Sequence, residues 1–155
     1  NKFKKDKVSV KTLQVDSISG AAMFYKKSLL NEIGSFNENL FWDEDIDFCL
    51  RANNFGKKVI FLPEIKLIHF GGKSSSKEQK IAITNQILSK IKLFKIHNSK
   101  LEYRIFLLLC LMVIPMKILL IVFLLPLKPK LFFKIYPYTL TFKLIASRDF
   151  DVVLN

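Results

Sequence analysis

The chain has 155 residues, half of them hydrophobic, and a formal net charge of +12. Heavy use of phenylalanine with few glycines and prolines excludes disorder as a description of the whole chain, and the length allows one domain with a core. Cys49 and Cys110 lie far apart in apolar runs, which excludes a disulfide framework and fits a reducing compartment. The lysine excess leaves three partners open: anionic lipid, a phosphorylated substrate or nucleic acid.

The first third of the chain is predicted to hold short strands and one short helix. Residues 12–16 alternate apolar and polar side chains and predict a strand, and residues 23–25 predict a second, buried one. Between them, residues 19–22 are all small, which suits a tight turn or a close approach of the backbone to a ligand. Residues 26–33 predict a helix that ends at Gly34.

An acidic cluster marks the start of the next predicted helix. Five of the 13 acidic residues fall within residues 36–51, around the only tryptophan, Trp42. Acidic side chains favour the positive end of a helix dipole, so we expect a helix to begin at Glu44 and to stop near Gly56. Acidic residues in this position commonly do no more than cap the helix.

Two of these acids are expected to have different roles. Asp47 can pair with Arg51 four residues later on the same face of the helix. At about 100° per residue, Asp45 and Asp47 project in nearly opposite directions and cannot both face one site. We therefore expect Asp47 to hold the helix, which leaves Asp45 free for another function.

Two further strands and a polar loop are predicted next. Residues 58–62 and 66–70 predict strands, and the first of them is stopped by Pro63. His69 lies at the end of the second strand, where a histidine taken alone is more often structural than a metal ligand. The glycines and serines of residues 71–76 form a loop that can offer hydrogen-bond donors to phosphate oxygens.

Residues 76–97 predict a basic amphipathic helix, because isoleucine and leucine recur at helical spacing among lysines. His97, at its polar end, is expected to be a surface residue. The composition changes at this point, and we place a boundary between a domain of residues 1–98 and a tail of residues 99–155.

The tail is predicted to associate with a membrane. Residues 105–125 are almost continuously apolar, and their length matches one bilayer crossing of about 20 residues. Pro115 and Lys117 would be costly near the middle of a crossing, so two shorter helices lying in the interface fit equally well. The lysines and aromatic residues of 128–138 are typical of a lipid headgroup layer.

Five short motifs occur in one order along the chain: residues 19–23, residues 34–38, residues 44–51, Gly56, and the pair Pro63-Glu64 followed by residues 68–74. In this order and spacing they resemble the C-terminal half of a family 2 glycosyltransferase of the GT-A fold, most similar to the bacterial rhamnosyltransferase-like branch. The resemblance covers roughly residues 12–98. It implies an α/β fold class: a partial GT-A fold, the acceptor-side half, followed by a hydrophobic helical membrane-associated tail. It also implies that a nucleotide-binding half precedes residue 1, so that the isolated chain would be inactive.

The resemblance implies a role for each motif. Asp45 is expected to be the general base of an inverting sugar transfer, and His69 to complete the site of a divalent metal, Mg or Mn. Substrate-binding positions are expected at Trp42, Glu44, Gly20, Ala21, Gly71, Gly72 and Ser74. The implied partners are a nucleotide-sugar donor, a glycan or lipid-linked acceptor, and an anionic membrane at the cytoplasmic face of the cell membrane, reached peripherally or through a single span.

Other readings of the sequence stay open. No Asp-x-Asp string of this chain ends a hydrophobic strand, so none is assigned the main metal-binding role. The Gln-x-x-Arg-Trp signature of processive synthases is absent, because the only tryptophan is Trp42. The alternative function is a non-catalytic, membrane-associated interaction protein whose acidic helix is structural. Nucleic acid is not expected as a partner, since charge alone suggests it and no RNA-binding signature or zinc spacing is present.

Overall fold

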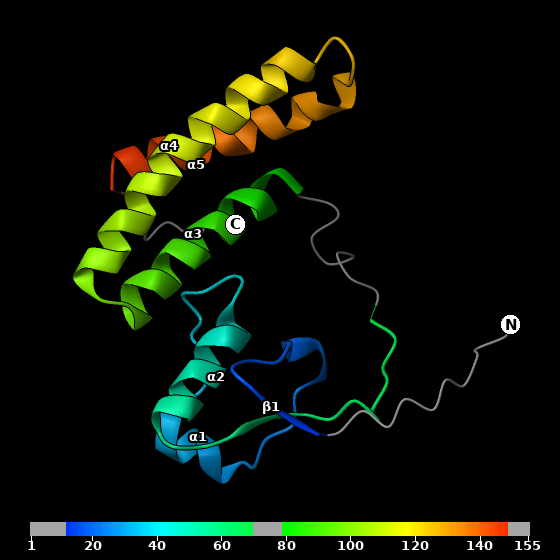
Figure 1. Cartoon of the computed structure of the whole chain (residues 1–155), viewed down its shortest axis with the longest axis vertical. Helices are drawn as coiled ribbons and strands as arrows, with labels where there is room; N and C mark the ends of the chain where they lie inside the picture. Colours follow the sequence, from blue (N-terminus) through cyan, green and yellow to red (C-terminus); the bar gives the residue numbers. More distant parts are fainter. Residues whose placement is uncertain (1–11, 70–78, 149–155) are drawn as a thin grey trace, which may run out of the picture.

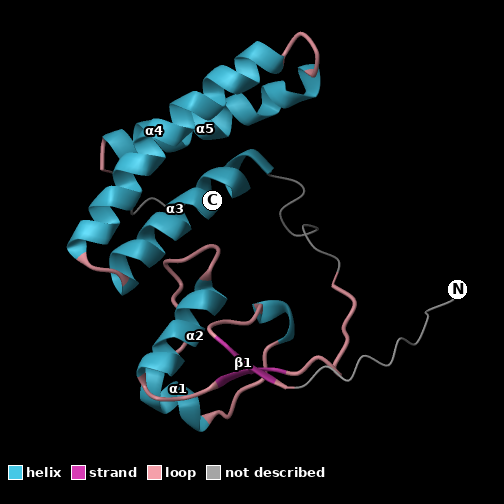
Figure 2. Ribbon diagram, in the orientation of Figure 1, coloured by secondary structure: helices cyan, strands magenta, loops and turns pink. Residues whose placement is uncertain are grey.

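The computed structural model describes residues 12–69 and 79–148 (Figure 1). This part of the chain is mostly helical, with one small sheet (Figure 2). Residues 12–69 hold the sheet and two helices, and residues 79–148 hold three longer helices that lie beside one another. Gly71, Gly72 and Ser74, which the resemblance makes substrate-binding, lie outside the described residues.

The sheet has two short strands. β1 (Leu13–Val15) pairs antiparallel with β2 (Val59–Phe61), with Leu13 opposite Phe61. Both strands were predicted. The strands predicted at 23–25 and 66–70 are wrong for the residues described: neither 23–25 nor 66–69 pairs with a strand, and Phe24 and Ile68 are largely exposed. A run of apolar residues becomes a strand only where a neighbouring edge supplies hydrogen-bond partners. The described sheet is therefore smaller than the α/β prediction requires.

The two helices of the first part end where local signals predict, and the second also begins at the predicted Glu44, whereas the first begins two residues later than predicted. A single turn of 3-10 helix, η1 (Gly20–Ala22), precedes α1 (Ser28–Ile33), and α2 (Glu44–Asn54) follows. Gly34 and Gly56 follow α1 and α2 with φ of 79° and 71°, a left-handed backbone that suits glycine. A small core joins the two helices around Ile33, Phe48 and Ala52.

The second part consists of three packed helices. α3 (Gln79–His97) is followed by α4 (Lys100–Leu124), a 3-10 turn η3 (Pro129–Lys134) and α5 (Ile135–Ala146). α4 and α5 form an antiparallel hairpin, and α3 runs beside it (Figure 1). Their common core is built on Leu88, Ile91, Ile114 and Ile145. α3 thus shares its core with the tail, across the composition boundary at residues 98 and 99.

α4 is one continuous helix of 25 residues with Pro115 inside it. The alternative of two helices separated at Pro115 is therefore wrong. A capping box starts the helix: Ser99 Oγ accepts a hydrogen bond from the Glu102 N–H, and the Glu102 carboxylate accepts one from the Ser99 N–H. In the described part of the chain α4 is the one helix long and apolar enough to cross a membrane, by length and composition.

Candidate active site at the start of helix α2

Two predicted site residues, 25 positions apart, meet at the first turn of α2. The backbone N–H of Gly20 donates to Oδ2 of Asp45 at 2.7 Å. Oδ1 of the same carboxylate accepts the N–H of Ile46 at 2.8 Å. A Cβ atom on residue 20 would lie 3.3 Å from Cβ of Asp45, so glycine permits this approach. Backbone groups therefore hold the carboxylate in one orientation.

The turn that carries Gly20 is itself anchored locally. Ser19 caps η1, and its Oγ accepts the N–H of Ala21 at 3.3 Å. Ala21 is exposed beside Gly20, as is Ser19. The small residues therefore form a tight turn, and they also let the backbone come close to another group, which here is the Asp45 carboxylate.

α3 fixes the segment that leads into α2. The Oγ of Ser89 accepts two hydrogen bonds, from the N–H of Phe41 at 3.1 Å and from the N–H of Trp42 at 3.2 Å. Ser89 is buried. The indole Nε1 of Trp42 is buried without a hydrogen-bond partner among the residues the structure describes. Ser89 was not predicted as part of the site, and no local pattern marks it.

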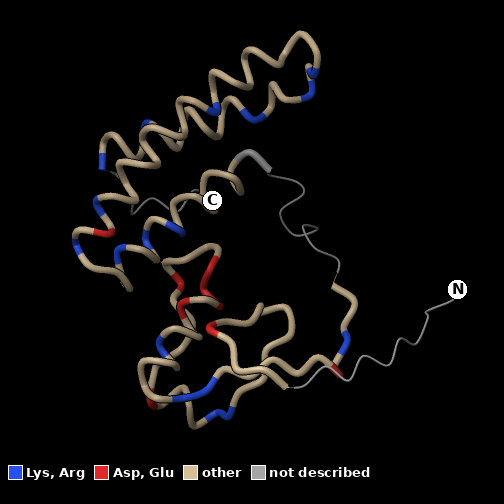
Figure 3. Tube along the Cα trace, in the orientation of Figure 1, with Lys and Arg blue, Asp and Glu red and all other residues tan. Residues whose placement is uncertain are grey.

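Asp43 precedes α2 in a left-handed conformation, with φ of 65°. Its side chain is mostly buried, and Nζ of Lys90 lies 3.8 Å from Oδ1. Burial raises the pKa of this carboxyl, the charge of Lys90 opposes that shift, and the charge of Asp45 adds to it. Figure 3 shows the acidic residues gathered around the start of α2, next to the basic residues of α3.

Asp47 lies on the other side of α2, at the centre of a buried ionic group. Its Oδ2 accepts a hydrogen bond from Nε of Arg51 at 2.9 Å and forms an ion pair with Nη2 of the same side chain at 2.8 Å, which confirms the predicted pair. Its Oδ1 lies 2.8 Å from Nε2 of His97, the last residue of α3. The Asp47 side chain is 1% exposed and that of His97 is 11% exposed.

The prediction that His97 is a surface residue is therefore wrong. The helix that it ends packs against the first part of the chain and delivers the imidazole to Asp47. The local sequence shows that this end of the helix is polar, but it does not show which distant helix packs against it.

Glu44 and His69 are two further predicted positions that the structure describes. Glu44 is the first residue of α2 and is half-buried. His69 is exposed in an unpaired segment. Among residues 12–69 and 79–148, no group of three or more His, Cys, Asp or Glu side chains is close enough to hold a metal ion. The metal role of His69 remains a prediction.

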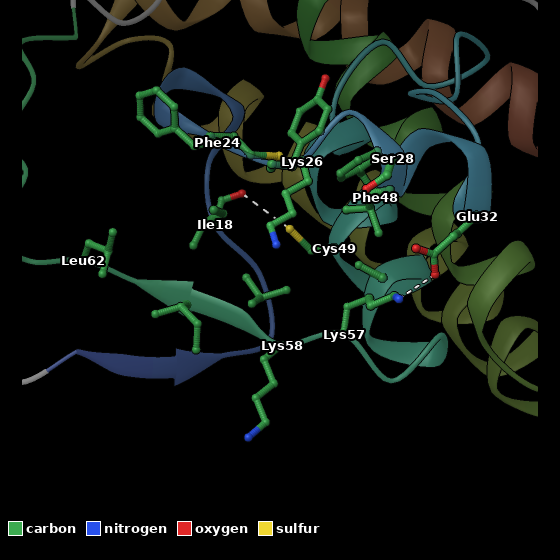
Figure 4. A pocket seen from close by; sticks show the side chains of 16 residues that line it. Ile18, Phe24, Lys26, Ser28, Glu32, Phe48, Cys49, Lys57, Lys58 and Leu62 are labelled. Atoms are coloured by element: carbon green, nitrogen blue, oxygen red, sulfur yellow. Dashed lines mark hydrogen bonds and ion pairs between the residues drawn. The ribbon is translucent and has the colours of Figure 1, made fainter.

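An open pocket of about 590 Å³ lies between α1, α2 and β2, and Asp45 is not among the residues that line it (Figure 4). Its lining combines apolar side chains, Phe48 among them, with Lys26 and Lys58, and Lys57 pairs with Glu32. Cys49 also lines it. Burial raises the pKa of that thiol, so the pocket offers no reactive thiolate at neutral pH. The sequence analysis did not predict this pocket.

Comparison with protein-family models, with curated proteins and with solved structures gives no match to this chain.

Proposed function

We propose that residues 12–98 form the acceptor-side part of an inverting glycosyltransferase of the GT-A, family 2 type, with Asp45 as its general base. The observation that supports this proposal is the contact between Gly20 and Asp45. The resemblance places both residues in one site, although 25 positions separate them. A proton acceptor needs a fixed position, and the carboxylate has one at the start of α2.

The proposed chemistry is a single displacement. The acceptor hydroxyl oxygen attacks the anomeric carbon of the nucleotide sugar as Asp45 takes the hydroxyl proton. The bond between that carbon and the diphosphate breaks on the opposite face, which inverts the configuration. The carboxylate of Glu44, next to Asp45 in the chain, and the indole of Trp42, three residues before Asp45, are proposed to orient the acceptor. A glycan or a lipid-linked intermediate is the proposed acceptor.

A divalent metal, Mg or Mn, would neutralise the leaving diphosphate. His69 supplies one ligand at most, and the described residues add no cluster around it. No step of the proposed reaction is therefore assigned to a metal. The apolar α4 and the basic tail support association with a membrane, and we place the protein at its cytoplasmic face.

One observation favours the alternative, a non-catalytic membrane-associated interaction protein. Both oxygens of Asp45 accept backbone N–H groups, from Gly20 and Ile46. A carboxylate that merely organises a helix start would make the same bonds. The two functions predict different results when the Asp45 charge is removed: a general base is needed for sugar transfer, whereas a structural carboxylate is not.

The test is Asp45→Asn in the longest protein that the gene encodes, assayed with labelled nucleotide sugars and membrane glycolipids. Asparagine keeps the oxygen that accepts the Gly20 N–H but cannot take a proton. We expect kcat to fall by about 10² or more with little change in the melting temperature. Glu38→Gln, at an exposed acid of the same stretch, is the matched control and should leave kcat unchanged. Normal turnover of Asp45→Asn would exclude the base role, and a wild-type protein that transfers no sugar would favour the alternative.

A further inference from the structure

One side of α4 carries an apolar surface that no other described residue covers. Large hydrophobic side chains recur there every three or four residues, and Leu108, Met116 and Phe123 are 61%, 67% and 77% exposed. The surface, called here the free face of α4, consists of Leu101, Ile105, Leu108, Leu109, Met112, Val113, Met116, Leu119, Leu120 and Phe123. A continuous apolar surface of this length marks an interaction site.

The opposite side of α4 is covered by protein. Ile114 and Ile121 are buried there. At the open end of the hairpin, the ring of Phe94 in α3 stacks on Phe106 in α4, with centroids 4.0 Å apart. Near the tip of the hairpin, Thr84 Oγ1 of α3 donates to the carbonyl of Pro137 in α5 at 3.1 Å. α3 therefore lies along most of the hairpin (Figure 1).

α3 is fastened in turn to the first part of the chain. Besides the hydrogen bonds to Ser89 and the contact of His97 with Asp47, Nζ of Lys92 donates to the carbonyl of Asn39 at 3.2 Å. If α4 crossed a bilayer lengthwise with these contacts intact, α3 and its lysines would enter the hydrocarbon. Charged side chains and irregular backbone are strongly disfavoured there.

The charges around the hairpin complement an anionic surface. The only acidic residue from 100 to 148 is Glu102, which is engaged in the capping box. The basic residues over the same range are Lys100, Arg104, Lys117, Lys128, Lys130, Lys134, Lys143 and Arg148. Three of them lie in or next to the turn η3 at the hairpin tip, and Arg104 and Arg148 border one hollow near the other end. Positive charge at both ends suits a helix that lies along headgroups.

We propose that the free face of α4 docks in the plane of an anionic bilayer, at the boundary of headgroups and acyl chains, instead of crossing the membrane. The helix, about 37 Å long at 1.5 Å per residue for its 25 residues, then contacts lipid along its whole length. α3 and the start of α2 stay on the aqueous side. In-plane docking holds whether or not Asp45 is a catalytic base.

Spin-label depth measurements test the orientation. In a Cys49→Ala, Cys110→Ala background, nitroxides are attached singly through Leu109→Cys, Met116→Cys and Phe123→Cys. These sites are seven residues apart, so they share one face and differ by about 10 Å along the axis. Gln86→Cys, at an exposed position of α3, is the control that should remain accessible to water. The full chain is bound to phosphatidylglycerol–phosphatidylcholine vesicles, and depth is read from oxygen and nickel-chelate accessibility.

In-plane docking predicts the same shallow depth at all three α4 sites and an aqueous signal at position 86. Greatest depth at position 116, with shallower values at 109 and 123, would show a crossing helix and overturn the proposal. Water accessibility at all three sites, or a chain that does not float with the vesicles, would overturn it as well. As a second measurement, Met116→Glu should weaken vesicle partitioning about tenfold or more, and Gln86→Glu should change it little. Equal partitioning of the two variants would contradict docking through the free face.

Discussion

The imidazole Nε2 of His97 lies 2.8 Å from Oδ1 of Asp47, 50 residues earlier in the chain. This contact joins the last residue of α3 to the first turns of α2, where Arg51 already occupies the other carboxylate oxygen. A buried carboxylate is tolerated only when its oxygens are paired. The His97–Asp47 contact therefore couples the packing of the helical part to the placement of α2.

A double-mutant cycle measures this coupling. We expect Asp47→Ala to lower the free energy of unfolding by about 3 kcal/mol or more, because it leaves the Arg51 guanidinium without its counter-charge and His97 without its carboxylate partner. His97→Ala should cost about 1–3 kcal/mol, since one oxygen of a buried carboxylate loses its partner. The stability loss of the double variant should be smaller than the sum of the two single losses by about 0.5–3 kcal/mol. Chemical denaturation of the four proteins provides the values, and additive losses would show that the contact carries no coupling.

His97→Gln distinguishes the contribution of the hydrogen bond to stability from that of the packing of the imidazole ring. The glutamine amide can donate to Asp47, so this variant should recover part of the stability that His97→Ala loses. Equal losses in the two variants would mean that packing of the imidazole, and not its hydrogen bond, is what matters.

Ser89→Ala should destabilise the segment that enters α2. One hydroxyl accepts the N–H groups of both Phe41 and Trp42, and its removal leaves two donors unpaired at a partly buried position. We expect a loss of about 1–3 kcal/mol in the free energy of unfolding, with a change in Trp42 fluorescence. Ser147→Ala is the matched control: this exposed residue follows α5, its hydroxyl donates to the carbonyl of Leu144, and its loss should change stability by less than about 0.5 kcal/mol. A loss no larger than that of the control would refute the role of Ser89.

Asp43→Asn should stabilise the protein in a pH-dependent way. Because burial raises the pKa of Asp43, the folded chain holds this proton over a range where the unfolded chain has lost it. The free energy of unfolding therefore falls as pH rises above about 4, and stays lower beyond the raised pKa. Asparagine carries no charge, so it removes the free-energy cost of burying an ionised carboxylate. It also adopts the left-handed backbone readily.

We expect the melting temperature of Asp43→Asn to exceed that of the wild type by about 1–3 °C at pH 7 and to equal it near pH 3. Thermal melts at several pH values check this. Asp16→Asn, which removes an exposed carboxylate, is the control. A difference between Asp43→Asn and the wild type that does not depend on pH would mean that the backbone conformation, and not the charge, is responsible.

Two glycine substitutions should have different effects. Gly20→Ala places a Cβ 3.3 Å from Cβ of Asp45, so it should displace the carboxylate by a few tenths of an ångström. If Asp45 is the base, we expect kcat to fall about tenfold with a small change in stability. Gly56→Ala meets no atom within 4 Å but must adopt φ of 71°, so it should cost about 1–2 kcal/mol in stability and leave kcat unchanged. The reverse assignment of the two effects would contradict the site geometry.

Sequence alone determined the features that depend on neighbours within about four residues. The stops at Gly34 and Gly56, the pair Asp47–Arg51 and the start of α2 follow from helix periodicity and backbone preferences. The apolar length of α4 was likewise readable from composition. The predicted strand at 23–25 is wrong, as is the one at 66–70 for its described residues 66–69, because strand formation depends on a partner edge that local sequence does not reveal.

Tertiary structure decided the contacts between distant segments. The resemblance placed Gly20 and Asp45 in one site, but no spacing rule states that the N–H of one reaches the carboxylate of the other. Ser89 and His97 gave no local signal at all, because their partners lie 47, 48 and 50 residues away. Such pairs depend on how α3 packs between the first part of the chain and the hairpin. That packing is set by the apolar side chains of three helices together, which periodicity within any single helix does not encode.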